Sequence, residues 1–101
     1  YNPSTGKWIL TGNMQVARYA YGAAQLSPRS GQVIVSGGTA IGVNGTYIAL
    51  TSTEVFTASS GTWSVKANMN NARANQRDLL MHNNDVLTAG GGTATEEVFT
   101  P

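Results

Sequence analysis

The chain contains no cysteine among its 101 residues. A disulfide framework, a thiolate metal site and a cysteine nucleophile are therefore excluded. His82 is the only histidine, and a metal site needs several ligands at a suitable spacing. The sequence predicts no resident metal, no other cofactor and no catalytic residue.

Charged residues are scarce, at 11% of the chain, and the formal net charge is +1. The six basic residues are spread along the whole sequence and form no cluster. A nucleic-acid-binding surface is normally a patch or stripe of lysine and arginine. Nucleic acid is therefore excluded as a partner.

Long hydrophobic runs are also missing. The longest apolar runs span a few residues, as at 33–35, whereas a membrane-spanning helix needs roughly 20. The N-terminus carries no signal-peptide pattern. Polarity comes from Asn, Thr, Ser and Gly more than from charge. This composition favours an extracellular or cell-surface location without a membrane span.

What the sequence does contain is an internal repeat. Residues 1–8 align with residues 56–63, so that an aromatic residue, a glycine and a tryptophan coincide at an offset of 55. The same offset brings a methionine and an arginine into register. These matches are Met14 with Met69 and Arg18 with Arg73.

Two further segments repeat at shorter offsets. Residues 32–38 match residues 85–91 at an offset of 53, and residues 54–57 match residues 97–100 at an offset of 43. The larger deletion falls within 39–52, which is predicted to be a long loop, because loops tolerate insertion better than strands do.

Each unit is predicted to contain four short strands. The candidates in the complete unit are rich in β-branched and aromatic residues and are separated by glycines. They are residues 20–26, 32–36, 53–57 and 62–66. The fold class is therefore all-β.

In this order of elements the chain resembles the Kelch repeat, a β-propeller blade of four antiparallel strands. The resemblance rests on a double glycine after the second strand, a glutamate and an aromatic residue in the third, and a tryptophan opening the outermost strand. The residues that carry it are Gly37, Gly38, Gly90, Gly91, Glu54, Glu97, Trp8, Trp63, Arg18 and Arg73. The innermost strands carry Tyr21 and Gln76, where many bacterial Kelch repeats have a histidine.

The resemblance implies about two blade equivalents. Residues 1–17 would supply the outermost strand of a preceding blade, residues 18–67 a complete blade, and residues 68–101 the first three strands of the next. The two tryptophans would then pack where adjacent blades meet. Repeat units cannot bury their faces alone, so further blades of the same chain or copies of itself are expected as partners.

Residues that recur once per unit are interpreted as scaffold. Arg18 and Arg73 are expected to pair with a glutamate or with backbone carbonyls of their own blade, since a buried charge is costly unless paired. His82 is expected in an exposed loop, and Asp78 is expected to form a local surface pair with Arg77.

The resemblance implies a non-catalytic module that binds a protein or glycan on loops, with 39–52 as the candidate surface. One alternative is a structural building block of a self-assembling or extracellular assembly. Another is the propeller part of a larger galactose-oxidase-like enzyme. Copper sites of those oxidases use tyrosines, histidines and a cysteine-linked tyrosine, so the missing cysteine argues against such a site at Tyr19 and Tyr21.

Asn44-Gly45-Thr46 is an N-glycosylation sequon within the predicted loop. Asn44 would carry a glycan if the protein were secreted by a eukaryote. The alternative is a plain turn.

Overall fold

A computed structural model describes residues 1–101, and its regular structure consists of strands and one short 3-10 turn. The elements are β1 (Gly22–Gln25), β2 (Gln32–Ser36), β3 (Thr39–Ile41), η1 (Val43–Gly45), β4 (Tyr47–Ala49), β5 (Thr53–Thr57), β6 (Thr62–Lys66), β7 (Arg77–Leu80), β8 (Val86–Ala89) and β9 (Glu96–Phe99). The all-β prediction is confirmed. The chain forms no helix with the length and apolar character that crossing a membrane requires.

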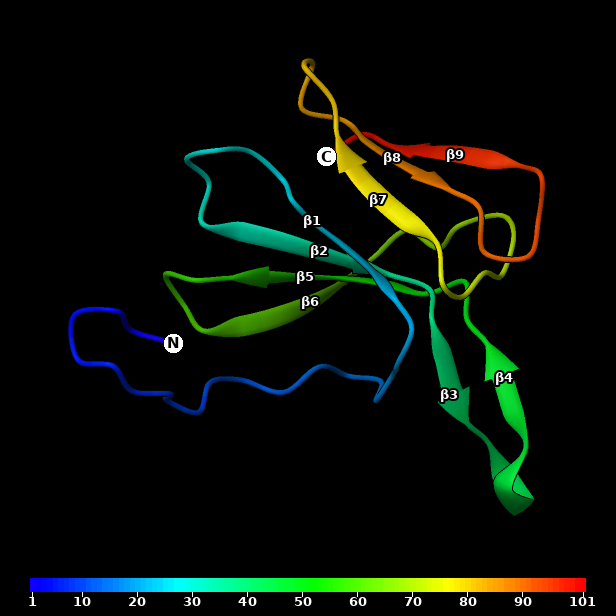
Figure 1. The fold of residues 1–101 in the computed structure, drawn as a ribbon, viewed down its shortest axis with the longest axis horizontal. Helices are drawn as coiled ribbons and strands as arrows, with labels where there is room; N and C mark the ends of the chain where they lie inside the picture. Colours follow the sequence, from blue (N-terminus) through cyan, green and yellow to red (C-terminus); the bar gives the residue numbers. More distant parts are fainter.

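The strands form three antiparallel sheets (Figure 1). Sheet A has the order β1-β2-β5-β6, and sheet B has the order β7-β8-β9. The third sheet is the pair β3-β4, which leaves sheet A between β2 and β5 and is called the projecting hairpin. All neighbouring strands pair antiparallel.

Strands β2, β5 and β6 have the bounds that the sequence predicts. Strand β1 starts later than expected, at Gly22, because Ala20 has a left-handed backbone with φ 54°. A residue in that conformation cannot continue a strand ladder. The chain therefore turns at Ala20 before β1 begins.

The segment 39–52 is more ordered than the predicted loop. Its β-branched and aromatic residues pair as β3 and β4, with Thr39 opposite Ala49 and Ile41 opposite Tyr47. Asn44 and Gly45, with φ of 61° and 72°, make the turn at the tip. Figure 1 shows this hairpin pointing away from both larger sheets.

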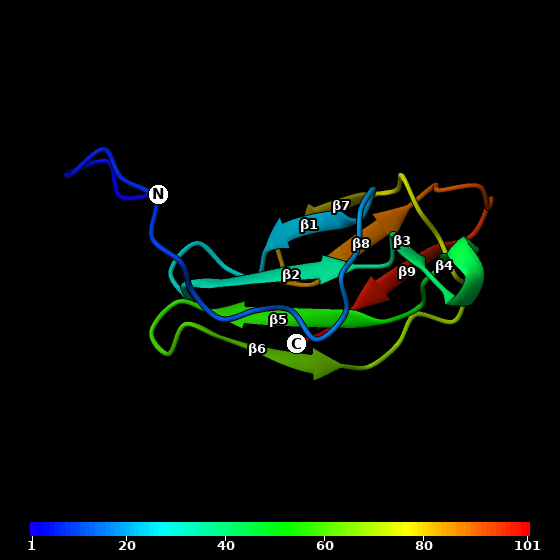
Figure 2. The ribbon, with the colours of Figure 1, turned by 90° about the horizontal axis from the view of Figure 1, so that it is seen from below.

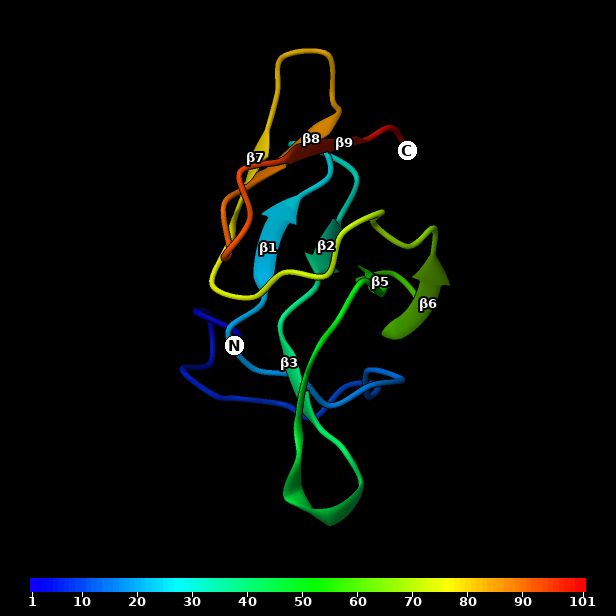
Figure 3. The ribbon, with the colours of Figure 1, turned by 90° about the vertical axis from the view of Figure 1, so that its right-hand side faces the viewer.

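Sheets A and B stack face to face, with β1 beside β7 (Figures 2 and 3). The core between them consists of a buried cluster with Ala24, Leu80 and Phe99 packed around it. Its fully buried members are Leu26, Ile34, Val55 and Val86. Alternate residues of β2 and β5 supply one side of this core, as expected of a half-buried strand.

Residues 1–17 lie on the side of sheet A that faces away from sheet B (Figures 1 and 3). The expected outermost strand does not form there. A strand needs a hydrogen-bonded neighbour, and the only ladder contact in this segment is the bridge between Asn2 and Lys7.

Candidate functional site

The first candidate site is an ion pair between Arg18 and Glu54. Arg18 Nη2 lies 2.8 Å from Glu54 Oε2, and the side chains are 0% and 1% exposed. The backbone N–H groups of Gln15 and Val16 donate to the same carboxylate at 2.6 and 3.3 Å. A buried charge is tolerated when it is paired and hydrogen-bonded. The predicted pairing is therefore present, and it holds the segment before β1 against the start of β5.

Arg18 also holds the connection between β2 and β5. Its Nη1 donates to the carbonyl oxygens of Gly37 and Ser52 at 2.8 and 2.9 Å, and its Nη2 donates to Ser52 Oγ at 3.1 Å. All of these partners are internal. Both terminal nitrogens of the guanidinium are therefore used internally. Its Nε has no hydrogen-bond partner and is buried, so it is out of reach of an external anion.

Sheet B repeats this arrangement. Arg73 Nη2 lies 3.0 Å from Glu97 Oε2, and the N–H groups of Asn70 and Asn71 donate to that carboxylate at 2.6 and 3.0 Å. Arg73 Nη1 donates to the Thr95 carbonyl at 2.8 Å. The same two chemical groups thus recur at equivalent places, each within its own sheet.

The surroundings of Glu97 favour its charged form. Burial by itself raises its pKa, but the N–H groups of Asn70 and Asn71 and the Arg73 guanidinium lower it by more. The pKa of Glu97 therefore lies below its ordinary value of 4.5. Such a carboxylate accepts hydrogen bonds and is a poor proton donor.

The double glycine Gly37-Gly38 lies where the two sheets meet. Both residues have left-handed backbones, with φ of 57° and 90°. A Cβ on Gly37 would overlap the carbonyl oxygen of Arg73, and the Gly38 N–H donates to that oxygen at 2.8 Å. Glycine is needed here for its backbone conformation and for the close approach of sheet B.

Gly90 and Gly91 have similar backbones, with φ of 82° and 83°. A Cβ on Gly91 would contact Ala74 and Arg73 of the same unit, whereas no atom lies within 4 Å of one on Gly90. Gly37 is thus covered by the next sheet, whereas its equivalent Gly90 is open.

A polar cluster that the repeat pattern does not indicate joins the two sheets. Ser36 Oγ donates to Asp78 Oδ2 at 2.7 Å, and Gln76 Nε2 donates to the Ser36 carbonyl at 2.6 Å. The prediction that Asp78 pairs with Arg77 at the surface is wrong. β7 lies against β1, so the Asp78 side chain packs over Gly22.

Burial raises the pKa of Asp78 above its ordinary value of 3.8, and the Ser36 hydrogen bond and the charge of Arg73 offset this only in part. Asp78 Oδ1 and Gln76 Oε1 are buried without hydrogen-bond partners. The junction therefore carries polar atoms whose needs are not fully met.

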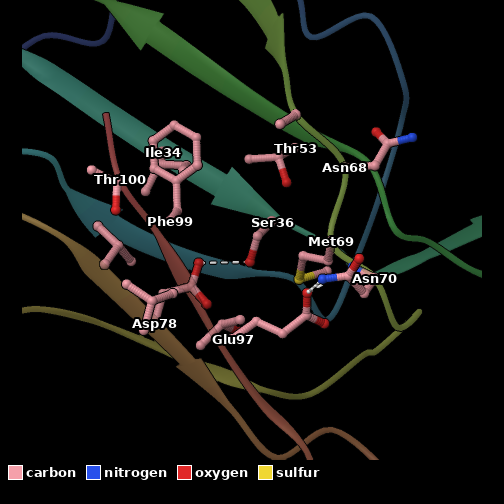
Figure 4. Close-up of a pocket in the computed structure, with 14 residues that line it drawn as sticks. Ile34, Ser36, Thr53, Asn68, Met69, Asn70, Asp78, Glu97, Phe99 and Thr100 are labelled. Atoms are coloured by element: carbon pink, nitrogen blue, oxygen red, sulfur yellow. Dashed lines mark hydrogen bonds between the residues drawn. The ribbon is translucent and has the colours of Figure 1, made fainter.

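A cavity of about 290 Å³ lies beside this cluster, between the two sheets (Figure 4). Sheet A, the 67–70 segment and sheet B all contribute to its wall. Its polar lining includes Ser36, Thr53, Asn70, Asp78 and Glu97, and its apolar lining includes Ile34, Met69 and Phe99. In this lining Asp78 Oδ2 accepts from Ser36 and Glu97 Oε2 pairs with Arg73, whereas Asp78 Oδ1 has no hydrogen-bond partner.

The two tryptophans differ in their surroundings. Trp63 in β6 packs against Phe56, with ring centroids 5.3 Å apart, and its Nε1 donates to the Gly12 carbonyl at 3.0 Å. Trp8 packs against Tyr1 at 5.4 Å but remains 83% exposed. The expected burial between blades is therefore not reached at Trp8, since no second layer covers it.

The projecting hairpin exposes several apolar side chains and is anchored at its root by hydrogen bonds. Mutual backbone hydrogen bonds at 3.0 and 2.8 Å join Tyr19 and Thr39 at its root. Its residues carry no charge. Four large exposed side chains cover it, from Ile41, Val43, Tyr47 and Ile48, and Tyr19 is exposed beside its root.

His82 and Asn44 both lie at exposed turns, which agrees with the expected exposure of His82. Asn44 has a left-handed backbone within η1, and Thr46 Oγ1 donates to the Val43 carbonyl at 2.9 Å. No group of three or more His, Cys, Asp or Glu side chains is close enough together to hold a metal ion.

Comparison with protein-family models gives no match to this chain, and no curated protein matches its sequence. A functional assignment therefore rests on the geometry of the chain itself. That geometry offers two surfaces, the projecting hairpin and the open face of sheet B.

Proposed function

We propose that this chain is a Kelch-type β-propeller segment that presents a binding hairpin on stacked blades and performs no chemistry of its own. The recurrence of the Arg–Glu pair, the double glycine and the strand order in both units supports the propeller assignment. These features form a rigid frame, and loops held on a rigid frame commonly carry recognition.

The observation that carries the binding proposal is the projecting hairpin itself. It interrupts sheet A between β2 and β5, and sheet B has only a short turn at the same place, between β8 and β9. An insertion with four exposed large apolar side chains and no stabilising partner layer costs solubility unless something covers it. Binding of a partner protein would cover this apolar surface and explain why the hairpin exposes it.

The chemistry of the hairpin indicates an uncharged, apolar protein segment as its partner. Tyr19 and Tyr47 form an edge-to-face pair with centroids 6.5 Å apart, and tyrosine supplies large contact area at low entropic cost. The outer edge of β4 is free, whereas that of β3 is occupied at Thr39 by Tyr19, so an extended peptide can add as a strand along β4.

Selection from a random peptide library on the immobilised chain tests this proposal. Extended peptides rich in apolar residues should be enriched, and their affinity should fall at least tenfold on a Tyr47→Ser, Ile48→Ser variant. Both positions are exposed, at 73% and 49%, so the variant should unfold at the same urea concentration.

A glycan array on the same two proteins separates the other class of partner. Glycan binding that is lost on the Tyr47→Ser, Ile48→Ser variant, with no peptide binding, would replace the protein partner by a carbohydrate. Absence of any binder that depends on the hairpin would refute the binding function.

A further inference from the structure

Sheet B leaves an apolar row open on the face turned away from sheet A. Leu79 pairs with Leu87, and Leu87 pairs with Val98, so the three residues form one row across β7, β8 and β9. Leu79 and Val98 are 58% and 54% exposed. The equivalent row in sheet A is covered by sheet B and consists of Ala24, Ile34 and Val55. The open row therefore has the character of a stacking surface that lacks a second layer.

The outer edge of β9 is open as well. In sheet A, β5 pairs with β6, whereas β9 pairs only with β8. Beside β6, the N–H of Gly12 donates to the Gly61 carbonyl at 2.9 Å, and Trp63 Nε1 donates to the Gly12 carbonyl. Ala67 is the repeat equivalent of Gly12, and neither hydrogen bond is formed there.

Residues 7–11 are the sequence counterpart of β6, and they have no strand to pair with beyond their own turn. Trp8, Ile9 and Leu10 are 83%, 74% and 101% exposed. The chain thus carries a β6-like segment without a β5 and, in β9, a β5-like strand without a β6.

The exposed faces of sheets A and B lack the polar pair that joins the two sheets, and both carry alanine in its place. At the junction of sheets A and B, Ser36 Oγ donates to Asp78. At the repeat-equivalent positions on the two outer surfaces, Ala89 stands for Ser36 and Ala23 stands for Asp78. If sheet A of another copy covered sheet B, Ala23 would face Ala89. No buried carboxylate or hydroxyl would then lack a partner at that point.

We propose that a second copy of this chain covers sheet B head to tail and repeats the junction between sheets A and B. Residues 7–11 of the second copy pair antiparallel with β9. The register follows from β5 and β6, where Val55 opposes Ser64 and Phe56 opposes Trp63. It places Ile9 of the second copy opposite Val98, with Trp8 of the second copy opposite Phe99.

Repeating the junction between sheets A and B also gives Ala67 the two hydrogen bonds that its equivalent, Gly12, forms. The Gly6 carbonyl oxygen of the second copy accepts from the Ala67 N–H, and Trp8 Nε1 of the second copy donates to the Ala67 carbonyl oxygen. Pairing also displaces Tyr1 of the second copy, because Tyr1 occupies against Trp8 the position that Phe99 takes in the assembly. One aromatic contact is exchanged for another, and the ladder of β9 is gained.

A head-to-tail contact uses two different surfaces, so each added copy presents a fresh open face. Association therefore continues until the ring closes. The proposal rests on the internal repeat, and it holds whether or not the projecting hairpin binds a partner.

Cysteine crosslinking tests the register, since the natural chain has no cysteine. Two separate variants, Ile9→Cys and Val98→Cys, are mixed under mild oxidation. Directly opposed residues have Cβ atoms about 4.5–5.5 Å apart, so a mixed disulfide dimer should form. The matched control mixes Leu10→Cys with Val98→Cys and should give several-fold less dimer, because adjacent residues point to opposite faces.

Sedimentation of the unmodified chain completes the test. A discrete multimer is expected, and Tyr1→Ala should lower the concentration at which it forms, because that variant removes the competing ring. Leu79→Asp should raise it while leaving the far-UV circular dichroism unchanged. A chain that stays monomeric at all concentrations, or equal crosslinking in both mixtures, would overturn the proposal.

Discussion

Arg18 and Glu54 meet at 2.8 Å in the interior of sheet A, and Arg73 and Glu97 meet at 3.0 Å at the equivalent place in sheet B. Each carboxylate also accepts two backbone N–H groups from the segment that precedes the innermost strand. In each unit, the ion pair and the backbone that donates to its carboxylate together join the segment before the innermost strand to the third strand. We call this arrangement the clasp.

Removal of one carboxylate should destabilise the fold. Glu54→Gln leaves Arg18 buried beside a neutral group, and loss of one partner from a buried pair costs about 3–5 kcal/mol. Glu97→Gln should cost less, because the Glu97 side chain is 13% exposed and Glu54 is only 1% exposed. Urea unfolding checks the order, with exposed Glu96→Gln as the control. Unchanged stability of Glu54→Gln would contradict the clasp.

Asp78 and Glu97 should give pH dependences of opposite sign. Asp78 has a raised pKa in the folded protein, so the fold holds its proton more tightly than the unfolded chain, and stability falls as pH rises above 3.8 through the folded pKa. Asp78→Asn should therefore be more stable than the natural chain at neutral pH, and the difference should vanish on acidification.

The pKa of Glu97 is lowered, so its contribution is present above 4.5 and is lost as pH falls through the folded pKa. Glu97→Gln should be less stable at neutral pH, and this difference should also vanish in acid. Urea midpoints across the acidic range check both variants. Parallel curves for the two variants would refute the assignment.

The two double glycines should respond differently to alanine. Both Gly37 and Gly90 have left-handed backbones, which cost alanine about 1–2 kcal/mol. Gly37→Ala adds an overlap with the Arg73 carbonyl, so it should be the more destabilising. Gly90→Ala has free space around it in one copy and should fold, yet sediment as a smaller species than the natural chain. Thermal unfolding and sedimentation together measure the contrast.

Asn44 should accept a glycan when the chain is secreted from eukaryotic cells. It lies at an exposed turn of the projecting hairpin, and its sequon is complete. Intact mass should fall after treatment with an N-glycosidase. Asn44→Gln should abolish the change, and a natural chain whose mass does not change would show that the turn is unmodified.

Features that repeat were predictable from the sequence. Arg18, Glu54 and the double glycine occur once per unit, and their recurrence indicated a structural role before any contact was known. The strand bounds of β2, β5 and β6 followed from β-branched and aromatic runs between glycines.

Features that occur once were not predictable. Asp78 corresponds to Ala23 and Gln76 to Tyr21, so no repeat pattern indicated that Asp78 and Gln76 join the two sheets. The β3-β4 hairpin has no counterpart in the second unit, and its strands are only three residues long on either side of a turn with asparagine and glycine. Contacts of this kind depend on how the sheets stack, which local sequence does not encode.

The hairpin also lengthens the loop that the clasp of sheet A closes. Arg18 and Glu54 are 36 residues apart, whereas Arg73 and Glu97 are 24 apart. A longer loop costs more entropy to close, by about 0.4 kcal/mol at this ratio. The insertion therefore changes the entropy of closing the clasp of sheet A only slightly.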